Sequence, residues 1–102
     1  MKLITKEIEK KLAKAPMYSK DGQGTDAEVV VKFFLTGTAA TWLVTEAEKL
    51  ENGDYEFFGY VDLGCGYEAG YFYLSEIEKC KNRFGLGVER DIYASGTVKD
   101  LM

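Results

Sequence analysis

The fold of this chain is decided by the stretch from Tyr55 to Tyr93, which reads YEFFGYVDLGCGYEAGYFYLSEIEKCKNRFGLGVERDIY. Apolar and polar side chains alternate from Tyr55 to Leu63, which is typical of a half-buried strand. A second aromatic strand is expected from Glu68 to Leu74, after a glycine-rich bend at Gly64 to Gly66 that favours positive φ angles. Because the connection is short, the two strands should pair as an antiparallel hairpin.

A helix and a short fifth strand are expected to follow this hairpin. Ser75 and Glu78 have the Ser-x-x-Glu spacing of a capping box, so Ser75 is predicted to cap the start of the helix. Gly85 is placed to end the helix as a left-handed C-cap. The run from Val88 to Ala94 predicts a short strand, and Thr97 is a candidate cap for a last helical turn.

The first half of the chain is expected to add one helix and two strands. Thr5 suits the N-cap of the helix, and Pro16 prevents the helix from continuing. Strands are predicted from Ala27 to Leu35 and from Thr41 to Glu46, with a polar connection from Ala47 to Asp54. The fold class is therefore α+β, a single domain over residues 1–102 with a twisted antiparallel sheet of about five strands and helices packed on one face. The side chains expected to be buried include Phe33, Trp42, Phe57, Tyr71 and Ile77.

Composition argues against several classes of function. The chain has 102 residues, of which 46% are hydrophobic and 14% aromatic, so it is expected to fold as one globular domain. Histidine is absent, which removes the commonest general base and metal ligand, and we expect neither enzyme activity nor a cofactor. The sequence has no apolar run of membrane-span length, and its charged start at Met1 to Glu7 is unlike a secretory signal, so the cytoplasm is the expected location.

Two smaller features are expected to be structural. Cys65 and Cys80 are fifteen residues apart and form no CxxC pair; free thiols are favoured over a disulfide, which stays an alternative. In the run from Glu89 to Asp91, Arg90 is expected to bridge a carboxylate or loop carbonyl groups.

The charge of the chain is uneven. Its formal net charge is −4, but residues 1–20 carry six lysines against two glutamates, whereas residues 46–78 carry nine acids against one lysine. The acidic sector suits a basic protein surface and repels phosphate, so the expected partner is a protein, without direct nucleic-acid or membrane binding. This sector is either an ordinary solvated face or a partner-binding edge, for which the predicted residues are Glu46, Glu48, Glu51, Asp54, Glu56 and Asp62.

The many aromatic residues of the strands allow three interpretations. They can pack in the core, form a tyrosine patch for a protein partner on the second face of the sheet, or stack against nucleic-acid bases. Base-stacking sheets surround their aromatic residues with Arg and Lys, but here the neighbours are Glu56, Asp62 and Glu68. Core packing is therefore favoured, followed by a protein-binding patch.

Several blocks of the sequence carry a family resemblance. They are FFGYV (57–61), GYFYLSEIE (70–78) and VERDIY (88–93), together with LITKEIEKKL (3–12), MYS (17–19) and TWLVTE (41–46). Taken together they resemble one small bacterial family that is catalogued only as a domain of unknown function (number 2958). The resemblance covers nearly the whole chain. It departs from the family at residues 11–19, where the family pattern is a proline-rich KLPPLYS-like run.

The resemblance implies a role in the biology of mobile genetic elements, because the family is frequent on plasmids and phages. Some proteins that look like this family are associated with inhibition of type II CRISPR effector nucleases. The leading hypothesis is therefore an anti-CRISPR or related anti-defence inhibitor that acts by stoichiometric protein–protein binding. The alternative is a non-enzymatic accessory domain that binds another plasmid or phage protein, and a single-strand nucleic-acid binder is a third hypothesis.

Overall fold

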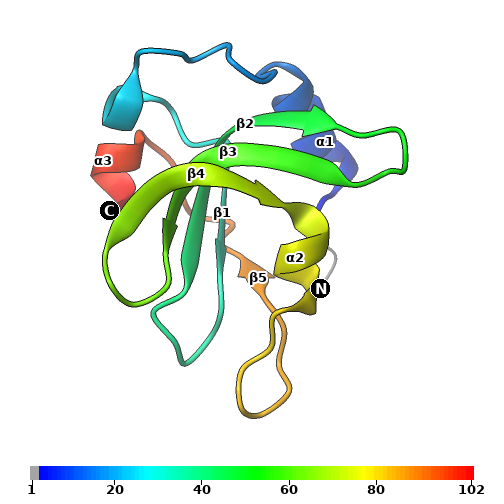
Figure 1. Ribbon diagram of the computed structural model, residues 1–102, viewed down its shortest axis with the longest axis vertical. Coiled ribbons are helices and arrows are strands. Elements are labelled where there is room, and N and C mark those ends of the chain that lie inside the picture. Colours follow the sequence, from blue (N-terminus) through cyan, green and yellow to red (C-terminus); the bar gives the residue numbers. More distant parts are fainter. Residues whose placement is uncertain (1–2) are drawn as a thin grey trace.

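The architecture is one open antiparallel sheet with helices packed against it, which confirms the α+β class (Figure 1). The computed structural model describes residues 3–102, so the start of the charged segment, Met1 and Lys2, lies outside the described residues. The strand order is β4-β3-β2-β1-β5. The strands are β1 (Val31–Phe34), β2 (Thr41–Lys49), β3 (Tyr55–Asp62), β4 (Tyr67–Tyr73) and β5 (Glu89–Arg90). The helices are α1 (Lys6–Ala13), the short 3-10 helix η1 (Gly24–Asp26), α2 (Leu74–Lys79) and α3 (Val98–Leu101).

The main core lies between one face of the sheet, which we call the core face, and the helices α1 and α2. Phe57 is at its centre, with its ring 6.1 Å from that of Phe33 and 5.7 Å from that of Phe72. A smaller cluster on the opposite, outer face joins Leu43 to Val98 of α3. The last helix therefore covers part of that face, although all helices were predicted to pack on one face. Four of the five residues predicted to be buried are buried: Phe33, Trp42, Phe57 and Ile77.

Tyr71 is the exception among the residues predicted to be buried, because its side chain is 54% exposed. In the β3–β4 register Tyr71 lies opposite Phe58, whereas Phe72 lies opposite the buried Phe57. Residues directly opposite each other point to the same face of a sheet. Tyr71 therefore belongs to the outer face, and Phe72 takes the core position beside it.

The helix predictions are confirmed at the two chain ends. Thr5 is the N-cap of α1, and its Oγ1 accepts a hydrogen bond of 3.3 Å from the backbone N–H of Ile8. Thr97 caps α3 together with the side chain of Asp100. The longest helix in residues 3–102 has 8 residues, and none of the described helices has the length and apolar character needed to cross a membrane.

The prediction for α2 was wrong at both ends. Its N-cap is Tyr73, whose backbone N–H donates to the Glu76 carboxylate at 3.0 Å. The Ser75 hydroxyl donates instead to Asp54 at 2.7 Å, so no Ser75–Glu78 capping box forms. The carboxylate of Asp54, which lies outside α2, therefore binds the Ser75 side chain that the local pattern predicted as the helix cap.

The segment after α2 is a hairpin-like loop, where a longer helix was predicted. The helix ends at Lys79, and Lys81 forms an antiparallel bridge with Gly87. The side chain of Asn82 accepts hydrogen bonds from two backbone N–H groups of the loop, those of Phe84 and Leu86. Gly85 has the expected positive φ of 80°, but it serves this turn and not a helix end.

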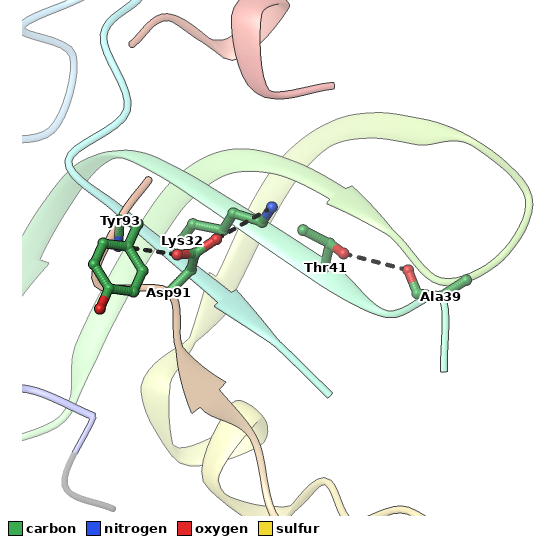
Figure 2. A network of polar contacts seen from close by, with 5 residues as sticks. All are labelled: Lys32, Ala39, Thr41, Asp91 and Tyr93. Atoms are coloured by element: carbon green, nitrogen blue, oxygen red, sulfur yellow. Dashed lines mark hydrogen bonds and ion pairs between the residues drawn. The ribbon is translucent and has the colours of Figure 1, made fainter. Parts of the chain in front are cut away.

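β5 has only two residues, although a strand was predicted from Val88 to Ala94. Asp91 ends it, because its carboxylate pairs with Lys32 at 3.6 Å and accepts from the backbone N–H of Tyr93 at 3.0 Å (Figure 2). Figure 2 also shows the Thr41 hydroxyl bonded to the carbonyl group of Ala39, beside the β1–β2 turn. As expected, Arg90 reaches a loop carbonyl group, that of Leu3.

A β-bulge divides β2 and determines which face its acids occupy. The register shifts between Val44 and Glu46, so that Glu46 lies opposite Phe58 and Ala47 lies opposite Phe57. The backbones approach closely here, because a Cβ on Gly59 would lie 1.9 Å from the carbonyl oxygen of Leu43. Without the bulge, Glu46 would follow Val44 onto the core face, because alternate residues of a strand share a face.

Candidate protein-binding surface

On the outer face of the sheet, the buried carboxylate of Glu46 holds the loop after α1 in place. Glu46 is only 3% exposed. Its Oε1 accepts from the backbone N–H of Tyr18 at 3.1 Å, and its Oε2 accepts from that of Lys20 at 2.7 Å. Hydrogen bonds to an ionised carboxylate are stronger than neutral ones. Glu46 was predicted to be part of an exposed acidic edge, but it is an internal anchor of the loop that follows α1.

The same loop runs beside β2. β1 pairs with β2 only as far as Val44, which leaves the second half of β2 open on that side. The backbone N–H of Ala47 donates to the carbonyl group of Ala15 at 3.0 Å, and Pro16 forms a parallel bridge with Ala47. The chain after α1 thus completes the sheet locally and leads onto the outer face.

Tyr18 stands exposed on this loop in an uncommon backbone conformation. Its φ is 71°, the left-handed region that residues other than glycine seldom occupy, and its side chain is 63% exposed. Such a conformation costs on the order of 1–3 kcal/mol and needs support from its surroundings. Glu46 gives that support through the Tyr18 N–H. Tyr18 lies close enough to the Tyr71 hydroxyl to help raise its pKa, so the loop and β4 contribute to one surface.

Two further tyrosines of β4 lie on this face. The Tyr71 ring is 5.0 Å from that of Phe58, and the Tyr73 hydroxyl donates to Glu56 at 3.3 Å. Desolvation raises the pKa of Tyr71, together with the Tyr18 side chain and the charges of nearby carboxylates. The charge of Glu56, followed by the hydrogen bond to it, raises the pKa of Tyr73. Both hydroxyls are therefore neutral donors at physiological pH.

We call this surface the tyrosine–acid face. The register of β2, β3 and β4 places its strand residues in two rows across the sheet. Glu48, Glu56 and Tyr73 form one row, and Phe58 and Tyr71 belong to the other. Glu48 is exposed and Glu56 is half-buried. The face is made of Tyr18, Glu48, Glu56, Phe58, Tyr71 and Tyr73. It unites the acidic residues and the aromatic residues that the sequence left as separate candidates.

The other predicted acids do not share one edge. Glu51 is exposed in the turn between β2 and β3, close in sequence to Glu48. Asp62 lies at the far end of β3, where its Oδ1 accepts from the backbone N–H groups of Gly64 and Gly66 and shapes the hairpin turn. The six acids thus form two groups. Glu48, Glu51 and Glu56 lie at one end of β3 and are at least partly exposed, whereas Glu46, Asp54 and Asp62 accept hydrogen bonds that hold other segments in place.

Asp54 belongs to the second kind. It accepts hydrogen bonds from the backbone N–H and the hydroxyl of Ser75, and one from the N–H of Tyr55. Burial opposes ionisation of Asp54, but these hydrogen bonds and the charge of Lys79 outweigh it and lower the pKa of the carboxyl group. Asp54 therefore joins the start of β3 to α2.

A groove of about 460 Å³ lies on the core face beneath β4. Its lining includes the apolar side chains of Trp42, Phe72 and Ile77. Cys65 and Cys80 also line it, and both thiols are free, as favoured from the sequence. Among residues 3–102 no group of three or more Cys, Asp or Glu side chains is placed to hold a metal ion.

These observations define a small α+β domain built on an open antiparallel sheet, with aromatic and acidic side chains gathered on its outer face. The chain belongs to the family described as "Protein of unknown function (DUF2958)", whose model matches residues 3–99, and the resemblance predicted from its sequence blocks is thereby confirmed. No curated protein and no solved structure matches the chain.

Proposed function

We propose that this protein is a non-enzymatic inhibitor from a mobile genetic element, which binds a type II CRISPR effector nuclease in the bacterial cytoplasm. The proposal rests on the tyrosine–acid face, where the exposed rings of Tyr18, Tyr71 and Tyr73 stand beside Glu48 and Glu56. It is also supported by the resemblance to proteins associated with inhibition of such nucleases.

The chemistry of the tyrosine–acid face suits a basic protein surface. Tyrosine gives a large, stiff contact area with a polar tip, and it is enriched among the residues that contribute most to protein–protein binding. Carboxylates beside such anchors complement lysine and arginine and accelerate association. An effector nuclease lines its nucleic-acid channel with these basic residues, so a protein bound there would compete with guide RNA or target DNA.

The direct test is a cleavage assay with a purified effector, its guide RNA and a DNA target. The wild-type protein is expected to inhibit at a one-to-one ratio with the effector. Reversing three charges in the variant Glu48→Lys, Glu51→Lys, Glu56→Lys should abolish inhibition by slowing association. The matched control changes three other exposed acids, Glu7→Lys, Glu28→Lys and Glu78→Lys, and should leave inhibition intact although its net charge changes equally.

A second variant separates the tyrosines from the charge. Tyr18→Ala combined with Tyr71→Ala should accelerate dissociation from the effector, measured by biolayer interferometry, while circular dichroism stays that of the wild type. If both variants inhibit as well as the wild type, the contact surface lies elsewhere. If the wild type inhibits no type II effector but captures a plasmid or phage protein in a pull-down, the accessory-domain alternative replaces the proposal.

A further inference from the structure

The free edge of β4 is open from Tyr67 to Phe72, whereas the backbone N–H of Tyr73 donates to the Glu76 carboxylate. β4 pairs with β3 residue for residue, from Tyr67 opposite Asp62 to Tyr73 opposite Glu56. Within residues 3–102, no backbone hydrogen bond from outside this ladder reaches residues 67–72. In Figure 1, no other strand runs along this side of β4. Alternate N–H and C=O groups of an edge strand point away from the sheet, so a row of donors and acceptors faces outward.

β4 has few of the features that usually protect an edge strand, and its one charged residue is Glu68. Natural sheets protect their edges with charged side chains, lysine above all, and with proline, bulges or very short strands. The opposite edge follows this rule, because β5 has only two residues, Glu89 and Arg90. β4 has seven residues, contains no lysine or proline, and keeps an unbroken register. A Cβ built on Gly70 meets nothing within 4 Å, so the core face of the sheet is uncovered at this position of β4.

Both sides of this edge offer sites for the side chains of an added strand. On the core face lies the groove of about 460 Å³, lined in part by Phe72, Ile77 and Leu63. On the outer face lie Tyr71 and Tyr73 of the tyrosine–acid face. Successive side chains of a strand point to opposite faces. An added strand would therefore place one set of side chains over the apolar groove and the other beside the tyrosines.

The charge around the β4 edge determines which kind of partner can bind there. Residues 50–78 contain seven acids and no lysine or arginine. Two of these acids, Glu68 and Glu76, line the groove itself, and Glu56 is on the outer face. A second copy of this chain would bring the same charges against them, which disfavours a symmetric pair. A basic strand is attracted by the same field.

We propose that the β4 edge binds an extended basic segment of a protein partner by strand addition, with lysine or arginine alternating with apolar side chains. The inference rests on the proposed function only in that both require a protein partner. It names the form that the partner takes at this edge, and it does not depend on the partner being a nuclease. Strand addition draws affinity from main-chain hydrogen bonds and specificity from the alternating side chains.

The test uses a synthetic peptide in which lysine and leucine alternate over seven residues, the length of β4. Amide hydrogen exchange by NMR is expected to show protection of the β4 backbone when the peptide is added. N-methylation of every second peptide bond gives two isomers. Only the isomer that keeps the N–H groups facing β4 should bind, because the other loses the inter-strand hydrogen bonds. A glutamate–leucine peptide should not bind.

Two lysine substitutions, one on the β4 edge and one away from it, form a matched pair of variants. Ala69→Lys should weaken binding of the lysine–leucine peptide by about tenfold or more, because it adds an edge charge of the same sign as the ligand. Ala39→Lys, at an exposed position in the β1–β2 turn, should bind like the wild type. Circular dichroism of both variants confirms the fold.

Three results of the peptide experiments would overturn the inference: absence of peptide binding, binding without protection of β4 amides, or equal binding of the two N-methylated isomers. A dimer in sedimentation that Ala69→Lys abolishes would also overturn it, because a second copy would then occupy the edge. These results are independent of the nuclease assay. A protein that inhibits the nuclease but fails here keeps its proposed function and loses only this docking mode.

Discussion

Phe57 and Phe58 are neighbours in β3, and they point to opposite faces of the sheet. Phe57 is completely buried between the strands and the helices, whereas Phe58 is half-buried beside the exposed Tyr71. The two faces thus carry similar aromatic side chains in different surroundings. On the core face α1 and α2 bring apolar side chains against the sheet; on the outer face a polar loop crosses, fastened by Glu46.

This difference shows what turns an aromatic strand into either a core or a binding surface. An aromatic ring is stabilised by burial wherever a partner covers it. The core face has its partners within the chain, namely Ile8 and Leu12 of α1 and Ile77 of α2. The outer face has internal partners over part of its area only, at α3 and the loop after α1. What remains uncovered is the tyrosine–acid face.

The largest expected effect is the loss of the Phe57 side chain. Phe57→Ala should lower the free energy of unfolding by about 3–5 kcal/mol, because it leaves a cavity at the centre of the core. Phe58→Ala should cost clearly less, because its ring is only half-buried. Urea denaturation of both variants measures the difference. Equal losses for the two variants would break the distinction between the faces.

The bulge gives the next largest effect. Gly59→Ala would place a Cβ 1.9 Å from the carbonyl oxygen of Leu43, so the backbone must shift; we expect a loss near the upper end of about 1–3 kcal/mol. Gly70 lies opposite Gly59 on β4, and a Cβ there meets nothing within 4 Å. Gly70→Ala is therefore the matched control and should leave the thermal midpoint nearly unchanged. A stable Gly59→Ala variant would show that the close approach at the bulge is not required.

Much of the fold could be predicted from the sequence because its signals are local. The cap at Thr5, the alternation along β3 and the glycine bend after Asp62 each depend on residues close together in the chain. The burial of Phe33 and Phe57 follows from the same alternation. The order of β1 to β4 then follows from short connections between neighbouring strands, whereas the place of β5 beside β1 depends on a pairing between residues distant in sequence.

Two of the failures have one physical cause, which is competition from residues distant in sequence. Ser75 was expected to cap α2, but Asp54 binds its hydroxyl from 21 residues away. Glu46 was expected at an exposed edge, but the bulge turns it to the outer face, where the N–H groups of Tyr18 and Lys20 enclose it. No local pattern marks a bulge of this kind. In the sequence, Tyr18 stands out only as part of a block that resembles the family. Its left-handed conformation depends on Glu46, which is distant in sequence, so no local pattern predicts it.

Removing the anchor of the outer-face loop should have an intermediate effect. Glu46→Ala leaves the backbone N–H groups of Tyr18 and Lys20 without their acceptor, and we expect a loss of about 1–3 kcal/mol in the free energy of unfolding. Glu48→Ala, two positions further along β2 but exposed, is the control and should be nearly silent. Hydrogen exchange should also accelerate at Tyr18 and Lys20 in the first variant. Unchanged exchange there would mean that the loop keeps its place without Glu46.

A smaller effect is expected for Asp54, which fastens α2 to the start of β3. Its pKa is lowered from the usual 3.8, so its contribution to stability is complete above that value and is lost as the pH falls through the lower pKa of the folded state. Asp54→Asn should therefore reduce the acid dependence of the unfolding free energy between about pH 5 and pH 2. Thermal midpoints measured across this range check the sign. A variant with the wild-type slope would show that other carboxylates cause the acid dependence.

The smallest expected signal concerns nucleic acid and tests the outer face directly. Tyr60, Tyr71 and Tyr73 could stack against bases in principle, as the aromatic residues of oligonucleotide-binding sheets do. Such binding also needs cations along the phosphate path, but Glu48 and Glu56 lie in one row with Tyr73. We therefore expect no electrophoretic shift of single-stranded or duplex DNA at micromolar protein and physiological salt.

The variant Glu48→Lys, Glu51→Lys, Glu56→Lys sharpens the test, because it keeps the aromatic rings and removes the repulsion between carboxylates and phosphates. If it binds single-stranded DNA and the wild type does not, the carboxylates are what make this aromatic face selective for protein. A shift with the wild-type protein would instead favour the base-stacking function over the inhibitor.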